Sequence, residues 1–106
     1  MIPFKEFKKL EFKVAQIKEV NDHPNADRLY IIVLDLGDKT KQVVAGIRGS
    51  YSKEGLVGKQ VVVVDNLDPV VLRGAESQGM ILAASDETGI VIVCPERKMK
   101  LGSIVR

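Results

Sequence analysis

The chain has 106 residues, of which 45% are hydrophobic, 28% charged and only 5% aromatic. These values favour one compact domain with an aliphatic core, and they exclude global disorder and, in the absence of a long apolar run, a membrane helix. The net charge of +2 does not by itself indicate a nucleic-acid partner. Residues 1–10 lack the apolar region of a signal peptide and Cys94 is the single cysteine, so we expect a cytoplasmic location.

The first predicted element is a short amphipathic helix. Phe4, Phe7 and Leu10 recur at intervals of three, and Pro3 suits the first turn of such a helix. From Phe12 onwards the pattern changes to the alternation and β-branched runs that are typical of strands. Five strands are predicted, the first with a bulge near Ala15: Phe12–Val20, Leu29–Leu36, Thr40–Ala45, Gln60–Val64 and Met80–Ala84.

The connections differ in length and in their turn-forming residues. Asn21–Asp27 is a dense cluster of turn formers, Ser52–Leu56 predicts one helical turn capped by Ser52, and Leu67–Gly79 is expected to be a long loop. Residues Ile90–Val93 and Ile104–Val105 are expected to add C-terminal strands. The pattern predicts an all-β fold: a five-stranded Greek-key barrel of the OB-fold type, with short helical segments, although other small barrels or a sandwich also fit it.

The residue types needed for most catalytic sites are missing. His23 is the only histidine, and no zinc-binding spacing, nucleophile signature or phosphate-binding glycine loop occurs. We therefore expect no enzymatic activity, no metal and no cofactor, and we expect the imidazole of His23 to bond nearby backbone.

Two segments hold the more distinctive residues. Residues 23–29 combine Pro24, Asn25 and Asp27 in what should be a rigid loop between the first two strands. In residues 65–80, the guanidinium of Arg73, the hydroxyl of Ser77 and the side-chain amides could bind phosphate, sugar or base edges. The spacing of Met80 favours a core position for that side chain. The candidate binding residues of this segment are Asn66, Arg73, Ser77, Gln78 and Met80.

The charges are unevenly distributed along the chain. Five basic residues and one acid lie between positions 39 and 64, and four basic residues and no acid lie between 97 and 106. Such a pattern could orient a polyanion, although an ordinary solvated surface also explains it. Lys41, Arg48 and Lys53 of this basic stretch complete the set of candidate binding residues.

Five motifs in this order resemble the EMAP-II-like tRNA-binding domain, over most of the chain. They are HPNADRLY from His23, VVAGI (Val43–Ile47), LVGK (Leu56–Lys59), NLxP (Asn66–Pro69) and RGAESQGMILAAS (Arg73–Ser85). That family includes free-standing tRNA-binding proteins and appendages of methionyl-tRNA synthetases. The resemblance implies a single OB-fold domain over residues 1–106 that binds tRNA by shape, in trans to an aminoacyl-tRNA synthetase or as a tRNA chaperone. It also implies a homodimer.

One departure from the family pattern concerns the segment after Leu67. The family usually places a lysine before Pro69 and a basic residue after it, whereas this chain has Asp68 and Val70. An acid at this position would weaken attraction to RNA. This motivates an alternative, a protein-interaction module or chaperone similar to CsaA or to a detached synthetase subunit. Motifs shared with the phenylalanyl-tRNA synthetase β chain also leave the protein partner open.

Overall fold

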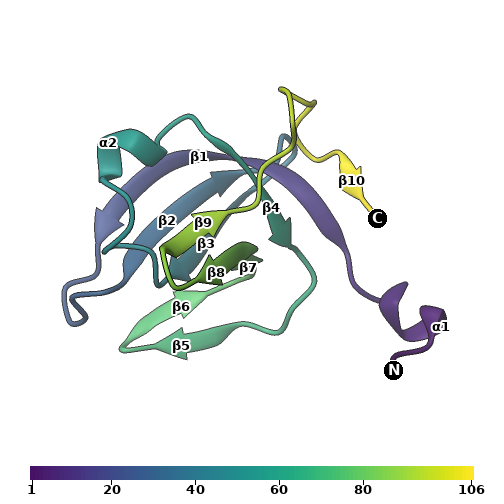
Figure 1. The fold of residues 1–106 in the computed structure, drawn as a ribbon, viewed down its shortest axis with the longest axis horizontal. Coiled ribbons are helices and arrows are strands. Elements are labelled where there is room, and N and C mark those ends of the chain that lie inside the picture. The colour runs from purple at the N-terminus through teal and green to yellow at the C-terminus, as the bar shows by residue number, and fades with distance from the viewer.

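A computed structural model describes all residues from Met1 to Arg106. It contains two short helices and ten strands (Figure 1). The helices are α1 (Phe4–Phe7) and α2 (Lys53–Leu56), and the strands are β1 (Phe12–Asp22), β2 (Tyr30–Asp35), β3 (Thr40–Ala45), β4 (Gln60–Val64), β5 (Val70–Leu72), β6 (Ala75–Ser77), β7 (Met80–Ile81), β8 (Ala83–Asp86), β9 (Gly89–Ile92) and β10 (Ile104–Val105).

The main sheet has the antiparallel strand order β3-β2-β1-β4-β7, and β10 pairs with the start of β1. The long strand β1 belongs to both halves of the barrel, because residues 12–16 pair with β4 and residues 16–22 pair with β2. A register shift between Ile17 and Glu19 marks this change of partner. The bulge predicted near Ala15 is therefore wrong in position, since the irregularity lies where β1 leaves β4 and continues along β2 alone.

The core is aliphatic, as the composition predicted. Alternate residues of β2 point inward, and four consecutive valines of β4 are buried. Leu56 of α2 and Ile47 join this cluster between β3 and β4. Ser52 caps α2 as predicted, because its Oγ accepts a hydrogen bond from the Gly55 amide at 3.0 Å. The all-β, OB-like barrel predicted from the sequence is confirmed.

The segment predicted as a loop over Leu67–Gly79 contains a hairpin, so that prediction is wrong. β5 and β6 are antiparallel and are joined by the two-residue turn Arg73-Gly74, whose φ angles of 54° and 92° are both positive. This is the geometry of a tight hairpin turn of the primed type. The turn escapes sequence reading because its first position holds arginine, where asparagine or glycine is the usual signal.

The barrel closes where the segment after β6 passes along β3. The Gln78 amide donates to the Gln42 carbonyl at 2.8 Å, and side chains of this segment complete the junction, as described below. Gly79 makes the close approach possible, since a Cβ at this position would lie 2.8 Å from the Val64 carbonyl oxygen. The predicted strand Met80–Ala84 is consequently divided into β7 and β8, with Leu82 bonded to Val62 between them.

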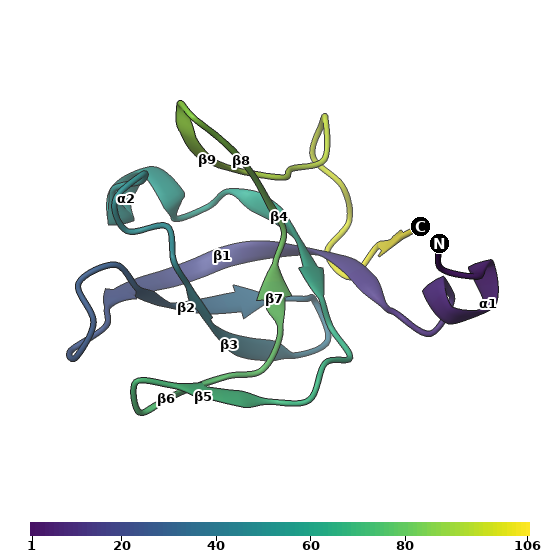
Figure 2. The ribbon, with the colours of Figure 1, turned by 60° about the horizontal axis from the view of Figure 1, so that its bottom comes forward.

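The two ends of the chain lie on one side of the molecule, and the β1–β2 loop and the tip of the β5–β6 hairpin lie on the other (Figures 1 and 2). α1 stands away from the barrel and buries none of its residues. The loop that follows β9 lies across the barrel from the β5–β6 hairpin in both views.

Candidate nucleic-acid interface

His23 connects the two loops that the sequence marked as distinctive. Its imidazole is buried, its Nδ1 accepts the Asn25 amide hydrogen at 3.0 Å, and its Nε2 lies 2.9 Å from the Leu72 carbonyl oxygen. Because a backbone N–H only donates and a carbonyl only accepts, the ring must be neutral with its proton on Nε2. The prediction that this imidazole bonds backbone is confirmed, and one of the bonds joins the β1–β2 loop to the tip of the β5–β6 hairpin.

A hollow of about 410 Å³ lies where these loops meet, lined by residues 25–29 and Arg73. Arg28 and Arg73 both face this hollow, and neither guanidinium forms a salt bridge within the chain. We call Arg28 and Arg73 the arginine pair. Two uncompensated guanidiniums from adjacent loops give planar donors for phosphate oxygens. Arg28 was missed as a site residue, although it belongs to the distinctive HPNADRLY motif.

Arg48 and Lys53 both contact one carboxylate. Arg48 Nε lies 3.4 Å from Asp22 Oδ1, Lys53 Nζ lies 3.2 Å from Asp22 Oδ2, and the Arg48 guanidinium also donates to the Ala26 carbonyl at 3.3 Å. These two predicted site residues are thus placed beside the β1–β2 loop. Their positive charge is partly compensated there, and Arg48 supports the loop that bears Arg28.

Lys41 points to the buried Asp65 rather than freely into solvent. The carboxylate of Asp65 is 3% exposed and lies 2.8, 2.9 and 2.7 Å from the ammonium groups of Lys13, Lys39 and Lys41. Burial raises the pKa of Asp65, but the hydrogen bonds from the three lysines outweigh burial and hold that pKa well below its usual range. The same contact raises the pKa of Lys13. This cluster retains a net positive charge at neutral pH.

Three predicted polar side chains make bonds within the chain. Ser77 is buried; its Oγ accepts the Val44 amide hydrogen and donates to the Gly79 carbonyl, both at 2.9 Å. Gln78 Oε1 accepts the Gln42 amide hydrogen at 3.0 Å. Asn66 holds the chain before β1, where it accepts from the Glu11 amide and donates to the Lys9 carbonyl. Ser77 and Gln78 therefore close the barrel against β3, whereas Asn66 ties the end of β4 to the segment before β1.

Met80 lies on the surface, so the core position that its spacing favoured is wrong. Its side chain is 50% exposed and lines a small apolar hollow of about 220 Å³ together with Ala45, Ile47 and Ile90. Its neighbour Ile81 packs against the core, and successive side chains of a strand point to opposite faces, so Met80 points outward. An exposed thioether beside an apolar hollow can pack against a planar base or an apolar side chain.

The first strand of the hairpin is apolar and exposed. Val70, Val71 and Leu72 of β5 are all exposed, and Asp68 precedes them. The departure from the family pattern noted above therefore lies on an accessible surface, at the end of the hairpin opposite its Arg73-Gly74 turn. No group of three or more His, Cys, Asp or Glu side chains is arranged to hold a metal ion, and no helix is long and apolar enough to cross a membrane.

Residues 12–104 match the family described as "Putative tRNA binding domain". The chain belongs to this family. The resemblance inferred from the five motifs is therefore confirmed, and so is the prediction of a tRNA-binding domain. Within the family's fold, the β1–β2 loop and the segment between β4 and β7 are the connections that OB-folds use for nucleic-acid binding.

Several curated relatives of this tRNA-binding domain are methionine–tRNA ligases. It is 50% identical to a methionine–tRNA ligase of Thermococcus kodakarensis over 99% of this chain, and 46% identical to that of Nanoarchaeum equitans over 100% of this chain. It spans only 14% of the length of these curated relatives.

Two solved structures have the same fold. A MetRS-related protein from Pyrococcus horikoshii superposes with a TM-score of 0.92 at 29% identity, covering 100% of this chain and 98% of that one. A CsaA chaperone protein from Picrophilus torridus superposes with a TM-score of 0.92 at 28% identity, covering 100% of both chains.

Proposed function

We propose that this tRNA-binding domain recognises folded tRNA through its backbone, without catalysing a reaction, and that the arginine pair makes the central contact. The observation that supports this most directly is that Arg28 and Arg73 are cations without a salt bridge on two adjacent loops, whereas the lysines of β3 and its turn are bound to Asp65. Phosphate contacts position a protein on RNA without reading its sequence. Recognition by shape follows from the fixed spacing of such contacts.

The other predicted site residues contribute in different ways under this proposal. Lys41, Arg48 and Lys53 add positive potential around the arginine pair, and Met80 packs against an unstacked base. Ser77, Gln78 and Asn66 act through internal bonds that fix the shape of the interface.

The proposed partner is a methionyl-tRNA synthetase in the cytoplasm, to which the domain presents tRNA in trans. Two observations support this: the methionine–tRNA ligase relatives, and the MetRS-related protein that matches over nearly the whole of both chains. A tRNA chaperone role would use the same surface. The lone exposed Cys94 is compatible with a reducing compartment.

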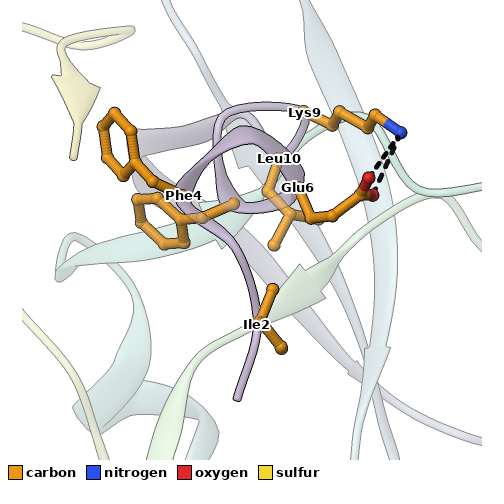
Figure 3. Close-up of a pocket in the computed structure, with 6 residues that line it drawn as sticks. Ile2, Phe4, Glu6, Lys9 and Leu10 are labelled. Carbon is orange, nitrogen blue, oxygen red and sulfur yellow. Dashed lines mark hydrogen bonds and ion pairs between the residues drawn. The ribbon is translucent and has the colours of Figure 1, made fainter.

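We further propose that two copies associate through the ends of the chain. Phe4 is 72% exposed and Ile104 is 66% exposed. Phe7 stacks on Phe12 with ring centroids 5.7 Å apart, so the aromatic side chains of α1 and of the start of β1 are in contact. Ile2, Phe4 and Leu10 line a hollow beside the ion pair of Glu6 and Lys9 (Figure 3). The alternative that both ends plug the barrel does not fit α1, which buries none of its residues. An apolar surface of this kind favours association with a second copy.

A titration of tRNA at several salt concentrations tests the proposed function. Affinity should fall steeply with salt, by roughly 0.7–0.9 in log units per phosphate contact against log salt. Folded tRNA should compete better than single- or double-stranded DNA of equal charge. Arg28→Ala and Arg73→Ala should each weaken binding and reduce the slope by about one contact.

Arg97→Ala is the matched control for these two substitutions. Arg97 is also an exposed cation without a salt bridge, but it belongs to the loop after β9, across the barrel from the hairpin (Figure 1). It should leave tRNA affinity nearly unchanged. Equal losses for all three variants, or equal affinity for any polyanion, would contradict a specific tRNA interface.

A protein-binding or chaperone function is the second candidate. The exposed strand β5, with Val70, Val71 and the preceding Asp68, favours it, as does the likeness to a CsaA chaperone protein. Suppression of aggregation of an unfolded polypeptide that is lost in Val71→Ser, with no salt-sensitive tRNA binding, would establish this alternative and reject the first.

A further inference from the structure

We propose that His23 is a positioning residue for RNA recognition, which orients Arg73 by a hydrogen bond between two loops. This inference rests on the proposed function, because it names the device that sets the geometry of the arginine pair. The imidazole itself is buried and contacts no ligand surface. Its effect on binding must therefore pass through the residues that it holds.

The two bonds of the imidazole have separate structural consequences. The bond from the Asn25 amide to Nδ1 spans two residues and closes the β1–β2 loop on itself. The bond from Nε2–H to the Leu72 carbonyl spans 49 positions and joins this loop to the hairpin. Leu72 directly precedes Arg73, so the second bond fixes the peptide from which the arginine departs.

The hairpin tip needs such a support. Arg73 has a φ of 54°, which lies in the left-handed region that a non-glycine residue adopts only at a cost in free energy. β5 has no buried residue, so packing holds it weakly. The cross-loop bond therefore supplies an anchor directly beside the strained residue. That residue, Arg73, faces the same hollow as Arg28.

Two substitutions separate the two bonds. His23→Asn keeps the local bond, because an asparagine oxygen readily accepts the amide hydrogen two residues further along, but its side chain is too short to reach Leu72. His23→Gln has a longer amide that can donate to the Leu72 carbonyl again. We expect tRNA affinity to fall roughly three- to tenfold in His23→Asn, the range that one lost hydrogen bond gives, and to recover largely in His23→Gln.

A double-mutant cycle with Arg73→Ala identifies the route of the effect. If His23 acts by orienting Arg73, then His23→Asn should cost little further affinity once the guanidinium is absent. If His23→Asn instead loosened the whole domain, it would lower tRNA affinity by the same factor in the wild-type protein and in Arg73→Ala. Thermal unfolding of all four proteins, and imidazole ¹⁵N shifts that report the Nε2–H form, check that the fold and the ring state are as described.

The outcomes distinguish the positioning role from the proposed function. Additive losses, or full affinity in His23→Asn, would overturn the positioning role while leaving the arginine pair as the tRNA contact. Unchanged affinity in Arg73→Ala would overturn both, because His23 would then have no contact to orient. Strong coupling together with rescue by His23→Gln would establish the inference.

Discussion

At the scale of single residues, Asp65 shows how the barrel uses its charges. A carboxylate that is nearly fully buried would be costly by itself, but three ammonium groups surround it, contributed by β1, β3 and the turn between β2 and β3. The cluster joins strands that are distant in sequence. It also explains why the basic stretch between positions 39 and 64 does not form a continuous basic surface, since Lys39 and Lys41 are paired with Asp65.

The stability of the protein should fall in acid because of Asp65. Its pKa is lowered on folding, so the stabilisation is complete above the ordinary carboxyl pKa of about 3.9 and is lost as pH falls below that value. Asp65→Asn should lower the unfolding free energy by about 2 kcal/mol at pH 7 and flatten its decline below pH 4. Urea unfolding at pH 7 and pH 3 measures both effects. Asp38→Asn, at an exposed turn, should retain the wild-type profile.

Ser77 provides a second test at this scale. Removing its hydroxyl leaves the Val44 amide without its partner, which should cost about 1–3 kcal/mol of unfolding free energy. Because the hydroxyl is buried, Ser77→Ala should weaken tRNA binding less than Arg73→Ala does. Ser85→Ala, on the exposed strand β8, serves as the control. A large loss of affinity at unchanged stability would instead indicate direct RNA contact by Ser77.

At the scale of elements, the β5–β6 hairpin combines strain and exposure. Backbone strain at an exposed, charged tip is a recurrent sign of a functional position, because a relaxed residue would serve stability better. Here the strained residue is the arginine that the resemblance and the geometry both select. Gly74 beside it accommodates its positive φ without strain.

Arg73→Asn should separate stability from binding in this hairpin. Asparagine adopts the left-handed conformation readily, so the unfolding free energy should stay equal or rise by about 1 kcal/mol, while tRNA affinity should fall because the guanidinium is gone. Chemical unfolding and filter binding on the same preparation measure the two quantities. A variant that is more stable than the wild-type protein and binds tRNA with the same affinity would contradict the proposed role of the arginine.

The elements also show what the sequence could predict. The bounds of β3 and β4 were predicted to the residue, because their β-branched runs end at clear turn residues. The hairpin was missed, since its two strands have three residues each and its turn lacks the usual residues. The internal roles of Ser77, Gln78 and Asn66 could not be predicted for another reason: each side chain has a bond to a position more than thirty residues away.

At the scale of the whole molecule, the ends and the binding loops occupy different sides. Pairing through α1 and β10 would therefore leave both copies of the arginine pair open, and a pair of copies could contact one large ligand at two places. The same separation means that association and tRNA binding can be tested independently.

Phe4→Ser combined with Phe7→Ser should produce a monomer. The substitutions remove the exposed aromatic surface of α1 without touching the core. Sedimentation equilibrium at micromolar concentration should change from the mass of two chains to that of one, 11.7 kDa. Val91→Ser, at an exposed apolar position of β9, should leave the mass unchanged. A single-chain mass for the wild-type protein would reject the dimer.

The barrel is closed along β3 by one backbone bond and by side-chain bonds of Ser77, Gln78, Gln42 and Lys41, whereas its other strands form ladders. Local unfolding should therefore begin at this junction, and the amides of Gln42 and Val44 should exchange with solvent before those of β1 and β2 do. A tRNA that touches both β3 and the hairpin would bridge the junction. Part of its binding free energy would then stabilise the closed barrel, so tRNA would slow the local opening of this junction.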